Sequence, residues 1–422
     1  MDLLEKASVI LTPTAYNNGE ALCVKPSDGS GDFDFSRNSA ATRVNAQGLV
    51  ENVQILSSNL VQNGDFSEEG VQEVSNGSFS QEGVEQADDS VISNAGGSIM
   101  TKVSALNYNA TSDGTGGSTV RPRLQFNNTT IGKSYRIRIT PTNQSGTIDF
   151  KLYDGSQYII SGNDLTTDVD LYFKAEGTNV FIAFDGTNIF NVDFEISLKE
   201  VGQGWTFLGG ASLTDLGAKI THTPTAGVLQ QSSILVVGKQ YKFTYEITES
   251  VLGSLKLQSA SVQTMDTSVG VHTKYFDATL TYLSIARTDP AGNDVTITNI
   301  SVKEVGQDWL FSGGAEITAQ GARINNTITG VNAFVKQVNS NLTIGKSLVF
   351  QYDVVQTNGK DLAIEQIGGN ISLNTSTIGN NRKVYFEFDR ADANLIIKRA
   401  AAATDVTITN ISVKEVGMDW NL

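Results

Sequence analysis

ISLKEVGQGW at residues 196–205 decides the fold of this 422-residue chain, because it recurs as ISVKEVGQDW at residues 300–309 and as ISVKEVGMDW at residues 411–420. Three nearly identical ten-residue segments do not arise by chance. Their spacing of roughly a hundred residues is the size of a small domain. The sequence therefore predicts three similar modules joined end to end.

Two further landmarks recur once in each module. A Gly-Lys pair opens an apolar segment, in TIGKSYRIRI at 130–139, VVGKQYKFTY at 236–245 and TIGKSLVFQY at 343–352. A Tyr-Phe pair follows at a similar distance, at Tyr172 and Phe173, Tyr275 and Phe276, and Tyr385 and Phe386. Apolar residues alternate with polar ones after each Gly-Lys, which is typical of a half-buried β-strand.

The whole pattern predicts an all-β chain of tandem jelly-roll-like β-sandwich modules after a short N-terminal β-rich segment. No apolar stripe of helical spacing is present, and glycine is abundant (40) while proline is scarce (6). Short strands at regular spacing with turn residues between them indicate a sandwich or a barrel. A module of this length also fits an immunoglobulin-like sandwich, so that topology stays open.

The last strand of each module carries a second prediction. In module 1 the apolar residues from Val192 to Leu198 alternate without a break, whereas modules 2 and 3 read VTITNISV, in which the alternation slips by one residue. A slip of this kind is typical of a residue inserted into one strand of a pair. We therefore expect β-bulges at Asn299 and Asn410.

The domain boundaries follow from the repeat and from a local duplication. Residues 61–70 read VQNGDFSEEG and residues 74–83 read VSNGSFSQEG, whereas modules 2 and 3 open with a tryptophan instead. The predicted division is an N-terminal segment at 1–70, then module 1 at 71–203, module 2 at 204–307 and module 3 at 308–422. Trp420 either closes module 3 or meets a partner.

Charge and cysteine content exclude several classes of protein. The formal net charge is −15, from 45 acidic and 30 basic residues, so phosphate backbones and anionic membranes would repel the chain. Residues 1–11 include Asp2 and Glu5, and their apolar stretch is too short for a signal peptide or a membrane span. A single cysteine, Cys23, excludes an internal disulfide framework and a cysteine-built metal cage.

A search for chemistry yields no catalytic residue, no metal ligand and no cofactor, and we expect no enzyme. His222 and His272 show no metal-ligand spacing and lie beside no nucleophile motif. Three repeated acids follow a lysine in the KEVG segment and suit a solvated ion pair at a strand end: Glu200, Glu304 and Glu415. The acidic turns at 32–34 and 88–89 show no calcium-loop spacing.

Glycan-binding residues are not identified by the sequence. Sugar sites use flat aromatic rings with amide, carboxylate and guanidinium groups beside them. All three tryptophans, Trp205, Trp309 and Trp420, lie at module seams. The two rings of each Tyr-Phe pair lie on opposite faces of a strand, so one of them can face outward, although packing in the core or at an edge is the favoured explanation of these rings.

Two segments resemble known families. The NGDF and NGSF segments look like the opening of carbohydrate-binding modules of the jelly-roll type. GDFDFSRNSAATRVNAQGLVE at 31–51 resembles a segment of bacteriophage virion proteins that often precedes lectin-like modules. The second resemblance implies a tail fibre, a spike or a head appendage, attached to the particle by its N-terminal segment.

Three functions remain open at this stage. The first is a virion structural protein, made in the host cytoplasm, whose modules contact host-surface glycans and which binds other virion proteins and copies of itself. The second is an architectural protein that decorates a capsid or a tail without binding sugar. The third, a spike enzyme that cleaves polysaccharide, is the weakest because no catalytic group repeats.

Overall fold

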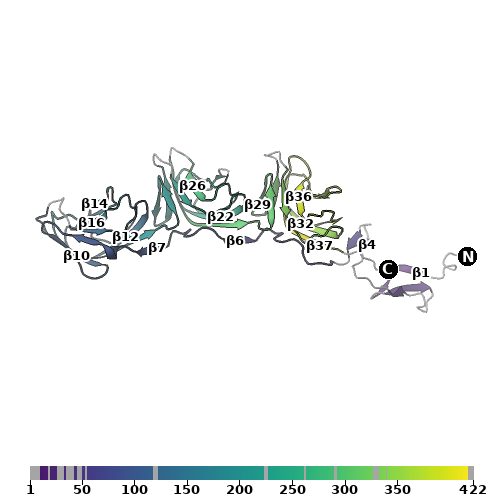
Figure 1. Ribbon diagram of the computed structural model, residues 1–422, viewed down its shortest axis with the longest axis horizontal. Helices are drawn as coiled ribbons and strands as arrows, with labels where there is room; N and C mark the ends of the chain where they lie inside the picture. The colour runs from purple at the N-terminus through teal and green to yellow at the C-terminus, as the bar shows by residue number, and fades with distance from the viewer. Residues whose placement is uncertain are drawn as a thin grey trace. The chain divides into compact units, whose positions relative to one another are not determined.

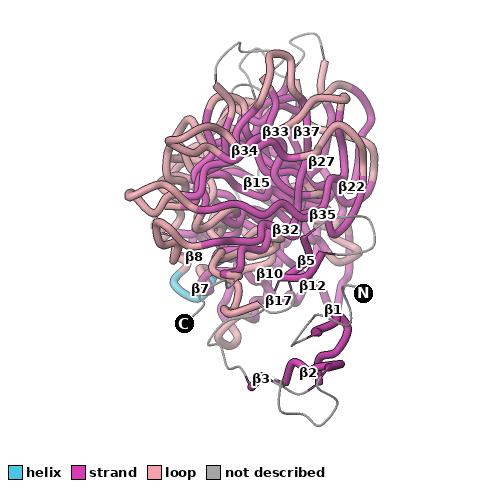
Figure 2. Tube along the Cα trace, turned by 90° about the vertical axis from the view of Figure 1, so that its right-hand side faces the viewer, coloured by secondary structure: helices cyan, strands magenta, loops and turns pink. Residues whose placement is uncertain are grey.

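The computed structural model describes residues 10–17, 20–25, 33–34, 42–44, 50–52, 55–116, 122–222, 227–260, 263–288, 292–326, 332–338 and 340–416. Side chains are described from residue 55 onward, 162 and 163 excepted. The chain forms two compact units, one of residues 1–68 with 306–422 and the other of residues 69–305. Across the described ranges the only helix is the 3-10 turn Ala87–Asp89, shown in cyan in Figure 2. No helix there is long and apolar enough to cross a membrane.

The N-terminal segment is built of short strands, as the fold prediction required. One antiparallel sheet has the order β1-β2-β3, with β1 at Ile10–Asn17, β2 at Glu20–Lys25 and β3 at Phe33–Asp34. A second pair is formed by β4, Thr42–Val44, and β5, Val50–Asn52. Most of the virion-like run from Arg37 to Val50 lies outside the described residues.

Module 1 is a sandwich of two antiparallel sheets. The first has the order β15-β12-β17-β10-β9 with β7 beside β17, and its strands are β7 Glu82–Glu85, β9 Ser98–Lys102, β10 Asn107–Asp113, β12 Ser134–Gly146, β15 Val169–Lys174 and β17 Ile189–Val201. The second has the order β14-β13-β16-β11-β8, with β8 Val91–Ser93, β11 Arg123–Phe126, β13 Asp149–Tyr153, β14 Tyr158–Asp164 and β16 Val180–Phe184. The chain crosses repeatedly from one sheet to the other, which makes the sandwich jelly-roll-like.

Module 2 repeats this strand order. Its first sheet runs β19-β20-β27-β22-β25 with β6 beside β27, through β6 Glu69–Gln72, β19 Ala211–Thr214, β20 Gly217–Thr221, β22 Gln240–Leu252, β25 Gly270–Asp277 and β27 Asp294–Val305. Its second sheet runs β18-β21-β26-β23-β24, through β18 Thr206–Leu208, β21 Val228–Gln231, β23 Leu255–Leu257, β24 Gln263–Thr264 and β26 Leu283–Arg287. Figure 1 labels β22 and β26, one strand of each sheet.

Module 3 has the same order again. Its first sheet runs β29-β30-β37-β32-β35, through β29 Ala315–Thr318, β30 Gly321–Asn325, β32 Ser347–Thr357, β35 Gly379–Glu387 and β37 Asp405–Glu415. Its second sheet runs β28-β31-β36-β33-β34, through β28 Trp309–Ser312, β31 Phe334–Gln337, β33 Leu362–Ile364, β34 Ile371–Leu373 and β36 Leu395–Arg399. The prediction of three sandwich modules is confirmed.

The alternating residues fill the core between the two sheets. After each Gly-Lys, every second side chain is buried, as Tyr135, Ile137 and Ile139 are in module 1. The Tyr-Phe pairs split in the same way, because neighbouring residues of a strand face opposite sides. The phenylalanine of each pair is buried, whereas Tyr385 is 46% exposed.

Both predicted β-bulges are present. The pairing of β22 with β27 shifts where two residues, Asn299 and Ile300, lie opposite one, and Asn299 has a φ of 49°. The pairing of β32 with β37 shifts in the same way at Asn410, whose φ is 53°. Asparagine tolerates this left-handed conformation better than most residues. In module 1 the shift lies on the partner strand instead, beside Asn143.

Residues 55–87, which we call the strap, add a segment to the last strand of each module. Residues 82–87 pair with β17 of module 1, residues 69–79 with β27 of module 2, and residues 55–66 with β37 of module 3. The strap therefore meets the modules in the reverse of their sequence order. In each case it covers the half of the last strand that the neighbouring strand leaves free.

The strap repeats every 13 residues, and one contact shows the period in all three modules. The side-chain oxygens of Asn59, Gln72 and Glu85 accept hydrogen bonds from the backbone N–H groups of Val413, Val302 and Leu198, at 2.9, 2.8 and 2.7 Å. The duplication at 61–70 and 74–83 belongs to this period. It is a repeated docking segment rather than the opening of module 1.

Residues 74–79 lie in the core of module 2, which differs from the predicted module 1 boundary at residue 71. Val74 and Phe79 belong to the same buried cluster as Trp205 and Phe207. The reason is chemical: Phe79 needs an apolar partner, and Trp205 at the start of module 2 supplies it. Module 1 proper begins after this segment, where β7 joins β17.

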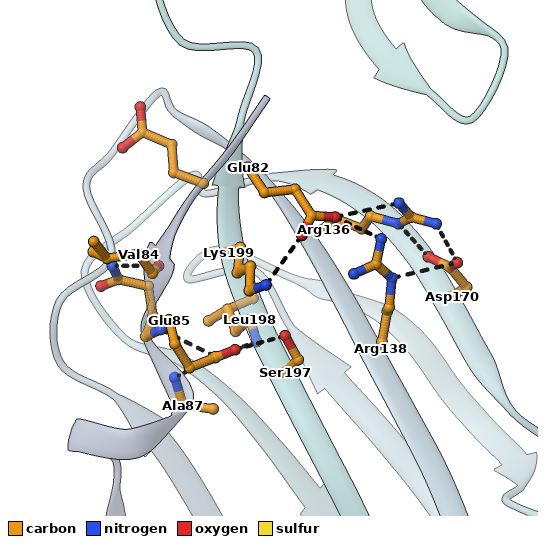
Figure 3. A network of polar contacts seen from close by, with 12 residues as sticks. Glu82, Val84, Glu85, Ala87, Arg136, Arg138, Asp170, Ser197, Leu198 and Lys199 are labelled. Carbon is orange, nitrogen blue, oxygen red and sulfur yellow. Dashed lines mark hydrogen bonds and ion pairs between the residues drawn. The ribbon is translucent and has the colours of Figure 1, made fainter. Parts of the chain in front are cut away.

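An ion-pair network joins the strap to module 1, as Figure 3 shows. Glu82 accepts hydrogen bonds from Arg138 at 2.5 Å and from Lys199 at 3.1 Å, and Arg136 lies 3.4 Å away. The hydrogen bond from Arg138 holds the pKa of the Glu82 carboxyl below its usual value. Module 2 has a smaller counterpart, in which Glu69 accepts from Lys242 and Lys303 at 2.5 and 2.9 Å.

Candidate functional site: an aromatic cleft on module 1

A cleft of about 380 Å³ opens on the outer face of module 1, on the sheet that contains β11, β13, β14 and β16. Six residues line it: Arg123, Gln125, Tyr153, Tyr158, Asn179 and Phe181. Three are aromatic and three carry a guanidinium or an amide. Rings with a few converging polar groups are typical of a site for a small polar ligand with apolar faces.

Strand alternation places these side chains outside the core. On β11, Leu124 and Phe126 are completely buried in the sandwich, so Arg123 and Gln125 face the other way. On β16, Val180 and Ile182 point inward and leave Phe181 outside. The outer face of a sheet is normally polar. A phenylalanine in the middle of it is therefore unusual.

The rings form a compact cluster around Phe181. The Phe181 ring stacks on that of Tyr153, with centroids 4.8 Å apart and 23° between the planes. The ring of Tyr158 meets both edge-on, at 6.2 Å from Phe181 and 5.2 Å from Tyr153. Phe181 is only 6% exposed as a result, whereas Tyr158 is 40% exposed. Tyr158 thus presents the accessible ring.

A cation completes the cleft. The guanidinium carbon of Arg123 lies 4.6 Å from the centre of the Phe181 ring, which is within cation–π distance. Gln125 is two residues further along β11, and its amide nitrogen lies 3.4 Å from the Asn127 side-chain oxygen. Together with the exposed Asn179, these groups supply hydrogen-bond donors and acceptors at the edge of the rings.

This arrangement suits a sugar ring. An exposed tyrosine offers a flat apolar surface for the C–H face of a pyranose, and amide and guanidinium groups bond hydroxyl oxygens. Among the described residues that line the cleft there is no carboxylate, histidine or cysteine. These lining residues offer an aromatic surface and hydrogen-bonding groups for binding.

The cleft does not recur in the other modules within the described residues. Strand pairing aligns Phe181 of β16 with Ser284 of β26 and Ile396 of β36. In module 2 the Ser284 hydroxyl bonds the Gln258 side chain at 3.0 Å. In module 3 the corresponding surface is charged, because Glu365 pairs with Lys398 and Arg390 at 2.7 and 3.0 Å. The three modules share a core but differ on this face.

The described tryptophans at the module seams lie outside the cleft. Trp205 and Trp309 are 5% and 7% exposed, and each covers a strap phenylalanine with ring centroids 5.3 Å apart. They belong to the packing between strap and module. Trp420 lies outside the described residues. No tryptophan with a described side chain therefore forms an open sugar platform.

The repeated glutamates lie in separate ion pairs. Glu200, Glu304 and Glu415 pair with the lysines of the Gly-Lys landmarks, Lys133, Lys239 and Lys346, at 3.3, 2.8 and 2.7 Å. Each glutamate lies on the last strand of its module, and its lysine immediately precedes the neighbouring strand, β12, β22 or β32.

The two histidines lie far from the cleft residues in sequence and share no metal-like cluster. His222 is exposed, and its backbone N–H donates to the Asn293 carbonyl. The His272 ring packs at 5.3 Å from the Tyr245 ring, and its Nε2 lies 2.6 Å from the Ser268 carbonyl. Within the described residues no three His, Cys, Asp or Glu side chains gather as a metal site would require.

Sequence reasoning missed the cleft, although a signal was present. DFKLY at 149–153 ends with an aromatic at an outward position, and VFIAF at 180–184 places a second aromatic outward between buried residues. The search for repeats found only residues shared by all three modules, and the cleft residues are not among them. Comparing the modules for their differences would have identified Tyr153 and Phe181.

No protein-family model and no curated protein matches the chain. Among solved structures, the tandem CBM22 domains of Paenibacillus barcinonensis Xyn10C are 9% identical, with 53% of this chain and 98% of that one covered at a TM-score of 0.22. A structure of the triple jelly roll fold and turret assembly in an archaeal virus is 13% identical, with 77% and 90% covered at a TM-score of 0.20. A Clostridium perfringens ZmpB structure with two CBM32 domains is 8% identical, with 80% and 58% covered at a TM-score of 0.16.

Proposed function

We propose that this chain is a structural protein of a bacteriophage particle and that the cleft of module 1 binds a glycan of the host surface. The observation that carries the glycan part is the cluster of Tyr153, Tyr158 and Phe181 on an outer sheet face, with Arg123 over it. The particle part is supported by the virion-like segment at 31–51. Residues 1–54, which precede the strap, are the proposed attachment.

A glycan array tests the first part. The full chain is screened beside Tyr158→Ala, which removes the exposed ring but leaves the core untouched. We expect binding to a restricted set of glycans and a loss of at least about fivefold in affinity with Tyr158→Ala, because one stacked ring contributes roughly 1–3 kcal/mol to binding.

The matched control is Tyr385→Ala, which removes an exposed tyrosine of module 3 that lies outside the cleft. It should bind as the unchanged chain does. Absence of binding on a broad array by the folded chain, or equal binding by Tyr158→Ala, would contradict the proposal. Mass spectrometry of purified particles tests the second part, and absence of the chain from them would overturn it.

The surfaces of modules 2 and 3 favour an architectural role for these two modules. Their surfaces at the position of the cleft carry a short hydrogen bond or ion pairs in place of rings. Their proposed role is therefore architectural, without sugar binding. Loss of glycan binding after a change at Glu365 of module 3 would contradict this division of roles.

A further inference from the structure

Modules 2 and 3 hold the strap in two grooves of the same construction. Each groove seats an Asn-Gly-x-Phe segment, 76–79 in module 2 and 63–66 in module 3. The main contacts between a groove and its segment are the same in both modules, although the Trp309 Nε1 also donates to the Gln62 carbonyl at 3.1 Å. They are also made by residues far apart in sequence, so chain connectivity does not force them.

The aromatic residue of the segment enters a pocket at the start of the module. Phe79 packs on Trp205 and Phe207, with ring centroids 5.3 and 6.2 Å away. Phe66 packs on Trp309 and Phe311 at the same two distances. In both modules the tryptophan Nε1 donates to the carbonyl of the segment's asparagine, at 3.0 and 3.1 Å. The tryptophan thus contacts ring and backbone together.

A buried glutamine in each groove forms hydrogen bonds with the backbone of the residue before the asparagine. Gln231 accepts from the Ser75 N–H at 2.8 Å and donates to the Ser75 carbonyl at 3.0 Å. Gln337 makes the same pair of bonds with Gln62, at 3.2 and 2.9 Å. The side-chain amide therefore pairs with both backbone groups of the residue that precedes the Asn-Gly turn, as a neighbouring peptide group would.

The β-bulge requires a glycine at the second position of the segment. It turns the Ile300 N–H outward, where it donates to the Gly77 carbonyl at 3.0 Å, and Ile411 does the same to Gly64 at 2.8 Å. A Cβ on Gly77 or on Gly64 would lie only 1.9 Å from the carbonyl oxygen of that isoleucine. No residue with a side chain fits at this position without a backbone shift.

We propose that modules 2 and 3 each carry a peptide-binding groove specific for an Asn-Gly-x-Phe turn, closed by a hydrogen bond from the phenylalanine N–H to the asparagine carbonyl, and that a second copy of this chain is the partner that supplies it. Two observations favour a second copy over an unrelated protein. Each chain carries two interchangeable segments and two equivalent grooves. The segment and its groove are separated by 129 residues in module 2 and by 246 in module 3, so a neighbouring copy can present the same segment.

Strand exchange of this kind links copies into an oligomer without any new surface. Within one chain the effective concentration of the strap favours its own groove. Exchange therefore needs a strap that has left its groove, or copies held close together in an assembly.

The test uses the full chain with Gly77→Val, which blocks seating of the strap in module 2 but leaves the groove unchanged. The probe is a fluorescent peptide of residues 72–83. We expect saturable binding to Gly77→Val and at least tenfold weaker binding to the unchanged chain, whose groove is occupied. An unlabelled peptide of residues 59–70 should compete, because the two segments are equivalent. The matched control is the 72–83 peptide with Val at position 77, which should not bind.

Mixing two variants tests the partner. Gly77→Val has a free groove, and Gln231→Leu has a damaged groove that frees a wild-type strap. Light scattering should show a species of twice the chain mass in the mixture, and little of it in either variant alone. If Gly77→Val does not fold, Phe79→Ala replaces it. No binding of the 72–83 peptide by either folded variant, or no dimer in the mixture, would overturn the proposal.

Discussion

Two phenylalanines show how strongly the strap is held. Phe66 and Phe79 both have a φ of 58°, in the left-handed region that bulky side chains rarely adopt. Such a conformation costs about 1–3 kcal/mol and persists only where surrounding contacts impose it. The packing of each ring on a tryptophan, and the hydrogen bond from each phenylalanine N–H to the carbonyl of the asparagine three residues earlier, impose it here. These rings therefore contribute more than the backbone strain costs.

Phe79→Ala is expected to destabilise module 2 by about 3–5 kcal/mol, because a buried ring leaves a cavity when it is removed. Urea unfolding of the full chain, followed by tryptophan fluorescence, measures the change. Val84→Ala serves as the control, since Val84 lies in the same strap but is 78% exposed, and it should stay within about 0.5 kcal/mol of the unchanged chain. Equal effects of the two changes would contradict the packing described.

Glu82 gives the strap of module 1 a dependence on pH. The hydrogen bond from Arg138 lowers its pKa below the usual 4.5, so the carboxylate stabilises the folded state above pH 4.5. That contribution is lost as the pH falls through the lowered pKa. Glu82→Gln should therefore cost about 1 kcal/mol at pH 7 and much less at pH 3.

Urea midpoints of Glu82→Gln and the unchanged chain at the two pH values check this sign. Glu195→Gln is the control, because Glu195 is an exposed carboxylate on the same strand, β17. A difference between Glu82→Gln and the unchanged chain that grows as the pH falls would contradict the assignment.

At the scale of the strand, each β-bulge explains both the slipped alternation in the sequence and a contact with the strap. The slipped alternation in VTITNISV identified both bulges, because an inserted residue reverses which face each later side chain takes. The pattern did not show that the bulges form hydrogen bonds with the strap. The bulge frees one N–H for the strap, and only a segment with glycine can approach it.

Asn299→Val is expected to destabilise module 2 by about 1–3 kcal/mol, since a β-branched residue at a φ of 49° is strained. Asn299→Gly should cost less, because glycine adopts this conformation freely, although it loses the 2.6 Å hydrogen bond to Glu246. Thermal unfolding ranks the two variants. A valine variant as stable as the glycine variant would show that the bulge is not required.

The sandwich elements could be predicted from the sequence and the strap could not. Burial of one strand face makes apolar and polar residues alternate with a period of two, so strands and modules can be recognised from the sequence. The strap pairs with strands far away in sequence, and a short segment of mixed polarity carries no sign of its partner. The 13-residue duplication was visible, but it was assigned to the opening of module 1, whereas Phe79 packs in module 2.

The cleft was hidden for a related reason. Its rings come from β13, β14 and β16, which meet only after the sheet has formed. Each ring alone reads as a core residue or a surface residue. Only their convergence with Arg123 distinguishes this face from the ordinary polar outer face of a sheet.

For the whole molecule, the reversed order of the strap has a consequence for folding. The segment at 55–66 is synthesised long before its partner strand β37, Asp405–Glu415. Module 3 is therefore complete only when both ends of its unit are present. A fragment that begins at residue 71 lacks this segment, so tests of glycan binding are better made with the full chain.

Hydrogen exchange tests most directly the claim on which the fold and the peptide grooves depend, that residues 55–66 dock on module 3 and residues 69–79 on module 2. In the unchanged chain both segments should be protected, because Leu60 and Glu73 donate to the carbonyls of Val413 and Val302. In Trp309→Ala, protection should fall in residues 55–66 and persist in residues 69–79. Equal loss in both segments, or no protection of either one in the unchanged chain, would contradict the account.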